Sequence, residues 1–374
     1  MRHTRIKLPA PAAYHITSRI KDDEFLLEGD EDKRDLLDII RRAAVFAGIT
    51  VMSYTILDNH FHLLVHIPER QDVDDTDLEH RTRILWGDEK AEAHFERWRF
   101  WELHGKAQRA EKERNALRRR MYDISPFVKT IKDAFRHSYK RRHGVSGAVW
   151  GRSRFKSAAV ASDFKTLATV AAYIDLNAVR ARIVRHPKSY KWCSLGAAKK
   201  GDRFILDGLN ALVACGVASA QKADYAMRTA VRTTNEAALD VYIRFLDGTK
   251  NIGDRFISDR TGNRNFGVKD GSVRGGYVRK TLDSMDLTRL GADGVAQWLA
   301  ESEIKPENWS EMWTRRFSNF VDGGILAPLG ILLTVRENIA RGAGLCNRWQ
   351  PNAIGEMWTL IHARNTAARK RNAG

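Results

Sequence analysis

The chain has 374 residues, of which 43% are apolar and 29% are charged. These proportions are close to those of folded domains, so they exclude a wholly disordered chain, a collagen-like repeat and a membrane protein. The charge is unusual, because 63 lysines and arginines outnumber 46 acids and leave a formal net charge of +17. An excess of this size favours a polyanionic partner, usually nucleic acid.

The excess charge is concentrated in one segment. Residues 118–200 hold 20 basic and 4 acidic side chains, a net charge of +16, whereas residues 1–117 have a net charge of −4 and residues 201–374 of +5. A solvated basic surface usually has acids among its bases, and here they are nearly absent. Segment 118–200 is therefore predicted to contact nucleic acid.

Cysteine usage predicts the compartment. Cys193, Cys215 and Cys346 are far apart and lack C-x-x-C spacing, so neither a disulfide framework nor a thiolate zinc site is predicted. The N-terminus has no apolar run of signal-peptide length, and no window approaches 18 uninterrupted apolar residues. We therefore expect a cytoplasmic protein.

The first 68 residues predict strand, helix, strand, strand. The β-branched and aromatic run at 13–20 predicts a strand, and 30–47 has helical apolar spacing, acids in its first turn and a glycine directly after it. Two further β-rich runs, 49–57 and 60–67, are separated by Asp58-Asn59, which is typical of a hairpin.

The remaining elements are mostly helical. Residues 70–119 are rich in Glu, Lys, Arg and Ala and predict a helical insertion, followed by a basic amphipathic helix at 124–141. A strand signal lies within 147–160, and 162–183 predicts one helix with Ser162 as its N-cap. Residues 197–374 form a mainly helical C-terminal region, for which accessory DNA binding is one open role. The order predicts an α+β fold with helices on a largely antiparallel sheet.

His60-Phe61-His62 is the most informative tripeptide. On a strand the two histidines share a face, and two imidazoles on one face can ligate a divalent cation. The pattern alone is weak, because an H-x-H in a strand is more often incidental. His66 shares that face further along, and His15 lies on another predicted strand; both are expected to be structural.

A second group lies on the helix predicted at 162–183. Tyr173 and Asn177 are four residues apart and share a face, and Arg180 lies close to it one turn on. They could supply a nucleophile, a neutral oxygen ligand and a phosphate anchor. A tyrosine in a helix is usually core or surface, so the group gains weight only together with the histidines and the basic segment.

Four motifs occur in a set order along the chain. They are YHITSR (14–19), NHFHLLV (59–65), Gly147 with Trp150 and Arg154-Phe155, and YIDLNAVRARIV (173–184) followed by YKWCSL (190–195). Together they resemble the single-tyrosine HUH transposases, in the branch related to the REP-associated tyrosine transposases. The resemblance covers roughly 10–70 and 120–196.

The resemblance implies a domain organisation. Residues 1–69 and 120–196 would form the catalytic domain, a ferredoxin-like, RRM-like palm in which helices cover one face of an antiparallel sheet. Residues 70–119 are longer than the connection expected at this place, and 197–374 match little of the family. A further departure is Asp58, which stands where the family usually has proline; it shares the histidines' face and could reach a metal indirectly, although a turn role is favoured.

The resemblance also implies the chemistry. His60 and His62 would bind Mg²⁺ or Mn²⁺ with Asn177 as third ligand, and Tyr173 would attack the scissile phosphate to give a 5′-phosphotyrosine and a free 3′-hydroxyl. The substrates implied are single DNA strands with hairpin or palindromic elements, which would associate the protein with the nucleoid. A homodimer and a monomer both stay open.

The basic segment is expected to complete the DNA site. Phosphate contacts and base stacking are predicted for Arg118, Arg119, Arg120, Lys129, Lys132, Lys140, Arg141, Arg142, Trp150, Arg152, Arg154 and Arg180. The alternative function is a non-catalytic, domesticated nucleic-acid-binding protein on the same scaffold. A two-tyrosine relaxase is disfavoured, because no second tyrosine lies on the predicted Tyr173 helix.

Overall fold

The structure is a computed structural model of the chain. It describes residues 8, 10–151, 155–220, 239 and 242–243 together with the short strand segments 268–269, 272–273, 325–327, 349–354 and 357–362. Most of the C-terminal region predicted at 197–374 therefore lies outside the described residues. No helix in the described part is both long and apolar enough to cross a membrane.

The centre of the fold is a βαββαβ unit. Its elements are β1 (Ala12–Arg19), α1 (Asp30–Ala47), β2 (Thr50–Ile56), β3 (His60–Ile67), α5 (Ile124–His143) and β4 (Lys156–Val160). The four strands are antiparallel and lie in the order β2-β3-β1-β4. This is the strand order of a ferredoxin-like sheet, so the predicted α+β fold is confirmed.

Register brings three strand ends together at one end of the sheet. Arg19 at the end of β1 pairs with His60 at the start of β3, and Ile56 at the end of β2 pairs with Phe61. The hairpin between β2 and β3 closes through the hydrogen bond that the Leu57 amide donates to the His60 carbonyl at 2.8 Å. The H-x-H motif therefore begins at a sheet end, next to a turn.

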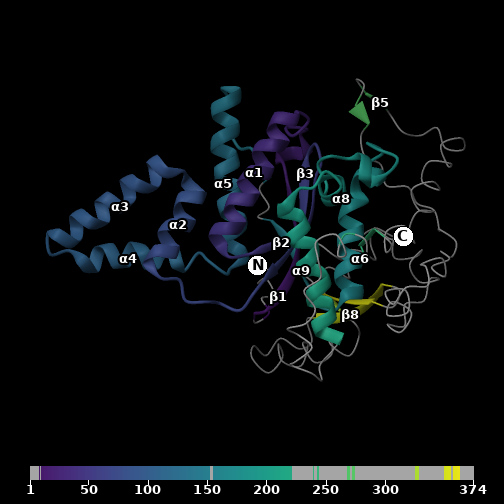
Figure 1. Cartoon of the computed structure of the whole chain (residues 1–374). Helices are drawn as coiled ribbons and strands as arrows, with labels where there is room; N and C mark the ends of the chain where they lie inside the picture. The colour runs from purple at the N-terminus through teal and green to yellow at the C-terminus, as the bar shows by residue number, and fades with distance from the viewer. Residues whose placement is uncertain are drawn as a thin grey trace, which may run out of the picture.

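Helices α1 and α5 pack together on one face of the sheet (Figure 1). α1 forms where it was predicted, because acids occupy its first turn and apolar residues face the sheet at helical spacing. Gly48 ends it in the left-handed conformation, with φ of 64°. A Cβ there would lie 2.6 Å from the Tyr122 ring, so the close packing at this end also requires glycine.

The other face is also covered, which the expectation of helices on one face did not include. It carries α6 (Phe164–Asp175), α7 (Asn177–Arg180), α8 (Ser194–Ala198) and α9 (Arg203–Ala220). Strand alternation explains the division: Phe61 contacts Trp150, which packs on α5, whereas His62 contacts Tyr173 of α6. The active-site candidates therefore lie between the sheet and α6.

The single helix expected over 162–183 is divided. Asp163 rather than Ser162 is the N-cap, because its carboxylate accepts a hydrogen bond from the Thr166 amide at 2.8 Å. α6 ends at Asp175, and Leu176 separates it from α7, although its φ and ψ of −75° and −6° keep the chain turning in the same sense.

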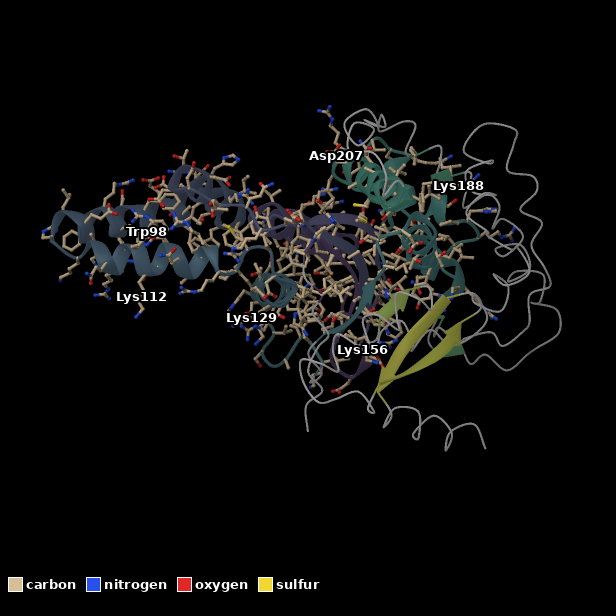
Figure 2. All side chains as sticks on the ribbon, turned by 90° about the horizontal axis from the view of Figure 1, so that it is seen from below. Trp98, Lys112, Lys129, Lys156, Lys188 and Asp207 are labelled. Atoms are coloured by element: carbon tan, nitrogen blue, oxygen red, sulfur yellow. The ribbon has the colours of Figure 1, made fainter. Side chains whose placement is uncertain are left out.

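The inserted residues form a helical arm that projects from the palm (Figure 1). It consists of α2 (Asp75–Trp86), α3 (Asp88–Leu103) and α4 (Ala107–Arg118). Trp98 lies between the arm's helices and is 1% exposed, and its indole N–H donates to Glu113 at 2.9 Å (Figure 2). The arm therefore has a small core of its own, with tryptophan in a packing role.

Further strands extend the sheet beyond β4. β7 (Ile325–Ala327) pairs parallel with β4, and β9 (Met357–His362) and β8 (Trp349–Ile354) continue the order. β5 (Val268–Lys269) and β6 (Ser272–Val273) form a separate pair. None of these strands was among the elements predicted from the sequence. Two short 3-10 helices, η1 (Lys21–Asp23) and η2 (Pro187–Ser189), complete the described elements.

Candidate active site

His60 and His62 lie on one face of β3, as the alternation of a strand requires. Their ring centroids are 5.0 Å apart. His62 is only 4% exposed, whereas His60 at the sheet end is partly exposed. Because β3 pairs with β1 on one side and β2 on the other, the backbone holds both imidazoles in place.

Each imidazole uses its Nδ1 atom within the protein. Nδ1 of His60 lies 2.6 Å from Oδ1 of Asn59, and Nδ1 of His62 lies 2.9 Å from both Thr17 Oγ1 and His15 Nε2. The Asn59 oxygen can only accept, so Nδ1 of His60 carries the hydrogen and Nε2 keeps its lone pair. Contacts of this kind orient imidazoles that bind metals.

The histidines are held neutral. Burial, assisted by the Arg19 guanidinium, lowers the pKa of His60 to about 3. Burial also lowers the pKa of His62 well below its usual value, and the neighbouring rings of His60 and His15 act in the same direction. Both side chains therefore present neutral imidazole at pH 7, which is the form that can ligate a cation.

Tyr173 reaches these histidines from α6. Its ring stands edge-on to His62 with centroids 5.8 Å apart, and edge-on to His15 at 5.7 Å. The side chain is 4% exposed. The guanidinium carbon of Arg180 lies 4.5 Å from the centre of the tyrosine ring, close enough for a cation–π contact. The sequence-predicted tyrosine, histidines and arginine are thus brought together.

Asn177 lies one turn beyond Tyr173 and is tied to it. Its Nδ2 donates a hydrogen bond to the Tyr173 carbonyl at 3.0 Å, which leaves Oδ1 as the remaining polar atom of the amide. The side chain is 7% exposed. Tyr173 and Asn177 are therefore neighbours, as their spacing of four residues predicts. They remain so although α6 ends between them, because the Leu176 backbone stays close to helical conformation.

The residues present fit a divalent cation. Within the described residues no group of three or more His, Cys, Asp or Glu side chains could hold a metal ion. The donors that the site does offer are the neutral imidazoles of His60 and His62, whose ring centroids are 5.0 Å apart, and the Asn177 side-chain oxygen would be the third donor of the predicted set. Imidazole with an amide oxygen is a mixed donor set of the kind that divalent metals accept.

Two residues of this site were not predicted from the sequence. His15 was expected to be structural, yet it stacks on His62 with ring centroids 5.1 Å apart and 15° between the planes, and it is fully buried. Thr17 reaches the same imidazole from the same strand. The alternation of β1 puts both on the histidine face, but only the β1–β3 register shows that they meet His62.

The family model described as "Transposase IS200 like" matches residues 11–78. Over these residues the chain is similar to the IS200-like transposases. The match contains His15, Thr17, His60 and His62 and ends within α2, so it does not extend to Tyr173. It agrees with the resemblance stated from the motifs.

One solved structure is similar to this chain over a larger part. It is that of a REP-associated tyrosine transposase bound to a REP hairpin, with 15% identity and a TM-score of 0.33 over 53% of this chain and 82% of that chain. None of the curated proteins matches the sequence. The similarity to the IS200-like transposases therefore rests on the segment 11–78.

The three arginines that follow the arm have different surroundings. Arg118 forms ion pairs with two acids of the arm, Asp75 and Glu111, the latter at 3.1 Å. Arg120 lies over the Phe46 ring at 5.1 Å, and burial lowers the pKa of its guanidinium. Arg119 is exposed. Of the three predicted DNA contacts, Arg119 is the one presented to solvent.

The basic residues of α5 divide in the same way. Lys129 and Arg141 are exposed, and Lys140 is partly exposed. Figure 2 shows Lys129 projecting from the palm. Arg142 instead donates to the Asp32 carboxylate of α1 at 2.8 Å and connects the two helices. The exposed side chains, rather than the whole basic run, form the candidate DNA surface on this helix.

Trp150 belongs to the core of the palm. It is 8% exposed, meets the Phe61 ring edge-on at 5.8 Å, and its indole N–H donates to the Lys132 carbonyl at 2.8 Å. The Lys132 ammonium lies 5.3 Å from the same ring. Little of Trp150 is therefore left for stacking on a base. Arg152 and Arg154 lie outside the described residues.

The basic end of α5 lies at the same end of the sheet as His60, although on the opposite face. Arg142 near the end of α5 pairs with Asp32 in the first turn of α1. The next residue, Lys33, pairs with Asp58 of the β2–β3 turn at 2.6 Å. These contacts occupy Asp58 as a turn residue.

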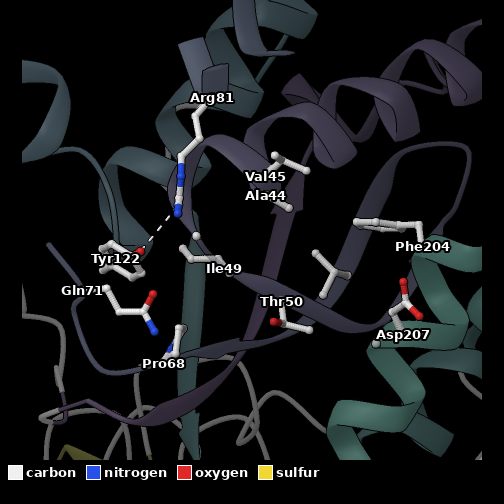
Figure 3. A pocket seen from close by; sticks show the side chains of 13 residues that line it. Ala44, Val45, Ile49, Thr50, Pro68, Gln71, Arg81, Tyr122, Phe204 and Asp207 are labelled. Carbon is white, nitrogen blue, oxygen red and sulfur yellow. Dashed lines mark hydrogen bonds between the residues drawn. The ribbon is translucent and has the colours of Figure 1, made fainter. Parts of the chain in front are cut away.

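A separate groove lies at the other end of the sheet (Figure 3). It has a volume of about 370 Å³ and is lined by residues of α1, β2, α2 and α9, including Thr50, Arg81, Tyr122 and Asp207. Thr50 pairs with His66, at the far end of β3 from His60. The groove is therefore distinct from the candidate active site and contains none of its residues.

Proposed function

We propose that the protein is a metal-dependent single-strand DNA endonuclease and strand transferase of the transposase type, acting in the cytoplasm on DNA of the nucleoid. The observation that carries this proposal is the contact between Tyr173 and His62, a nucleophile from one element and a metal ligand from another, 5.8 Å apart between ring centroids. The family of residues 11–78 supports the same class of activity.

The bound cation would supply charge neutralisation to the phosphate, whose negative charge grows in the transition state. His60, His62 and Asn177 would hold it. Because imidazole favours transition metals whereas oxygen donors suit Mg²⁺ and Mn²⁺, this set favours Mn²⁺ over Mg²⁺.

Tyr173 would carry out the covalent step. Its hydroxyl oxygen attacks phosphorus, the bond from phosphorus to the 3′ oxygen breaks, the phenol loses its proton and the departing 3′ oxygen gains one. The products are a 5′-phosphotyrosine and a free 3′-hydroxyl. Arg180, 4.5 Å from the ring centre, would favour the negative phenolate oxygen. A later 3′-hydroxyl can reverse the step without ATP, because the phosphodiester energy is kept.

The substrate proposed is single-stranded DNA with a hairpin. Exposed cations at Arg119, Lys129 and Arg141 would contact the backbone of such a strand. The solved transposase in the comparison was bound to a REP hairpin, and a labelled hairpin with single-stranded flanks is the corresponding probe for this protein.

The test is covalent trapping. The full-length protein is incubated with a labelled hairpin oligonucleotide and Mn²⁺ or Mg²⁺, and the adduct is separated under denaturing conditions. We expect an adduct that disappears in Tyr173→Phe and in the double variant His60→Ala/His62→Ala. Salt-sensitive hairpin binding with no adduct under either metal would instead support the non-catalytic DNA-binding alternative.

A further inference from the structure

Asp175 is a fully buried carboxylate that the proposed chemistry does not use. It is the last residue of α6, two residues after Tyr173 and two before Asn177, and its exposed fraction is 0%. Burying a carboxylate is costly unless hydrogen bonds compensate it. Because Asp175 lies in sequence between Tyr173 and Asn177, hydrogen bonds to Asp175 can hold both of those residues in position.

Both carboxylate oxygens accept hydrogen bonds from other parts of the chain. The Leu195 amide donates to Oδ1 at 3.1 Å, and the Tyr242 hydroxyl donates to Oδ2 at 2.5 Å. Leu195 belongs to α8, whereas Tyr242 belongs to the C-terminal region. Burial raises the pKa of Asp175 to about 6, although the bonds from Tyr242 and Leu195 act against that rise. The end of α6 is thus tied to two segments.

A third hydrogen bond holds the same turn against the sheet. The Thr55 hydroxyl of β2 donates to the Ile174 carbonyl at 2.6 Å. Thr55 is also the residue that pairs with His62 across β2 and β3. The end of α6 that follows Tyr173 is therefore held to β2 through Ile174 and to Leu195 and Tyr242 through Asp175.

Tyr242 reaches Asp175 together with two other apolar residues of the C-terminal region. Leu239, Tyr242 and Ile243 each have helical backbone. Tyr242 is fully buried, and the other two pack against the same hydrophobic core. Of these three residues, Tyr242 forms the hydrogen bond with Asp175, through its hydroxyl group.

We propose that Asp175 is a positioning residue through which Tyr242 of the C-terminal region holds the Tyr173–Asn177 turn against the histidines. On this basis residues C-terminal to the palm help to assemble the active site. The inference rests on the proposed function only for its catalytic consequence. The structural part, that Tyr242 stabilises the last turn of α6, stands on the contacts alone.

The test compares three variants of the full-length protein. Tyr242→Phe keeps the buried ring and removes the hydroxyl donor, and Asp175→Asn keeps an acceptor for Leu195 while changing the contact with Tyr242. Tyr190→Phe is the matched control, because its buried hydroxyl donates to the Ile56 carbonyl at 2.6 Å and makes no contact with Asp175 in the described structure. Each is measured for hairpin affinity and for the rate of adduct formation at saturating DNA.

We expect Tyr242→Phe and Asp175→Asn each to slow adduct formation about tenfold with hairpin Kd within about twofold of wild type, because both lose the hydrogen bond that the Tyr242 hydroxyl donates to a carboxylate oxygen. The double variant should be no slower than the slower single variant. Tyr190→Phe should react within about twofold of the wild-type rate, although it also loses a buried hydrogen bond. Wild-type rates in both test variants, or an equal slowing in the control, would overturn the proposal.

Hydrogen exchange of the backbone amides separates this inference from the proposed function. Peptides spanning 173–177 should exchange faster in Tyr242→Phe than in wild type and Tyr190→Phe. If wild-type protein forms no adduct, the proposed function fails and this measurement alone decides the structural part. Unchanged exchange in 173–177 would then overturn the positioning role of Asp175 as well.

Discussion

His15 of β1 and His62 of β3 lie on paired strands and their rings stack, with Nε2 of His15 lying 2.9 Å from Nδ1 of His62. The contact restricts both the rotation of the His62 ring and the nitrogen that carries its hydrogen. A hydrogen on Nδ1 would be shared with His15 and Thr17, and Nε2 would then present its lone pair to a cation. His15 would thus orient a candidate metal ligand without itself binding the cation.

Replacing His15 should weaken metal use more than DNA binding. In His15→Phe the ring remains and can still stack, but the Nε2 contact is lost. We expect the Mn²⁺ concentration for half-maximal adduct formation to rise about tenfold or more, as is common when such a supporting contact to a metal ligand is removed. The measurement is a metal titration of the adduct rate with hairpin Kd determined in parallel.

Thr17→Val is the matched comparison for that titration, because it removes the other partner of the same His62 atom. It should shift the metal requirement in the same direction by a smaller factor, since the stacked ring remains. A His15→Phe protein with the wild-type metal requirement would show that His15 only fills the core.

Two neighbouring arginines of α5 should behave differently when replaced. Arg141 is exposed, and Arg141→Ala is expected to weaken hairpin binding and to reduce the slope of log Kd against log salt by about 1. Arg142 is paired with Asp32 and Asp35 at 2.8 and 3.1 Å. Arg142→Ala should instead lower the free energy of unfolding by about 1–2 kcal/mol.

The two arginine variants serve as controls for one another. Hairpin binding is measured over a series of salt concentrations, and unfolding is measured with urea on the same preparations. A lower salt slope in Arg142→Ala together with an unchanged slope in Arg141→Ala would contradict the assignment of the exposed residue to the DNA surface.

The sequence predicts relationships within one helix or strand, but not which charged side chains are neutralised in the fold. The period of two along β3 predicts that His60 and His62 share a face, and the spacing of four predicts that Tyr173 and Asn177 are neighbours. Both relationships lie within one element, so local geometry decides them. The charge run at 118–142 predicts cations, but which of them are neutralised depends on acids elsewhere, such as Asp32, brought near by the fold.

Contacts between segments that are far apart in the sequence could not be predicted from local patterns, because they depend on how the chain folds. His15 reaches His62 only through the β1–β3 register. Tyr242 reaches Asp175 across 67 positions of sequence. Even the N-cap of α6 was misplaced by one residue, since Ser162 and Asp163 are both suitable caps and only the backbone shows that Asp163 accepts the Thr166 amide.

The packing of α9 on β2 predicts a strong effect of one methyl group. A Cβ on Gly208 would lie 2.0 Å from the Val51 carbonyl oxygen, so the helix would have to move away from the strand. Gly208→Ala is expected to destabilise the fold by about 1–3 kcal/mol, as overpacked cores do. Asp207→Ala, the exposed neighbour on the same helix (Figure 3), should change stability by less than about 0.5 kcal/mol.

Thermal or urea unfolding of both variants checks this prediction. A Gly208→Ala protein as stable as wild type would mean that the α9–β2 contact can relax without cost. A large loss in Asp207→Ala would point to a role of that carboxylate in stability that its exposure does not suggest.

His66 predicts a pH effect on stability at the far end of β3. Burial lowers the pKa of this imidazole below its usual value of 6.5, and the ring is only partly exposed. At pH above 6.5 neither the folded nor the unfolded state binds the proton. As the pH falls below 6.5 the unfolded chain takes up the proton first, so the contribution of His66 to stability is lost in that range.

Replacing the imidazole with a group that does not titrate should remove this contribution. His66→Gln is therefore expected to lose less stability than wild type between pH 7 and pH 5, by less than about 1 kcal/mol because water partly screens the ring. Urea unfolding at pH 7, 6 and 5 measures the difference. Parallel pH profiles for the two proteins would show that His66 has the same pKa folded and unfolded.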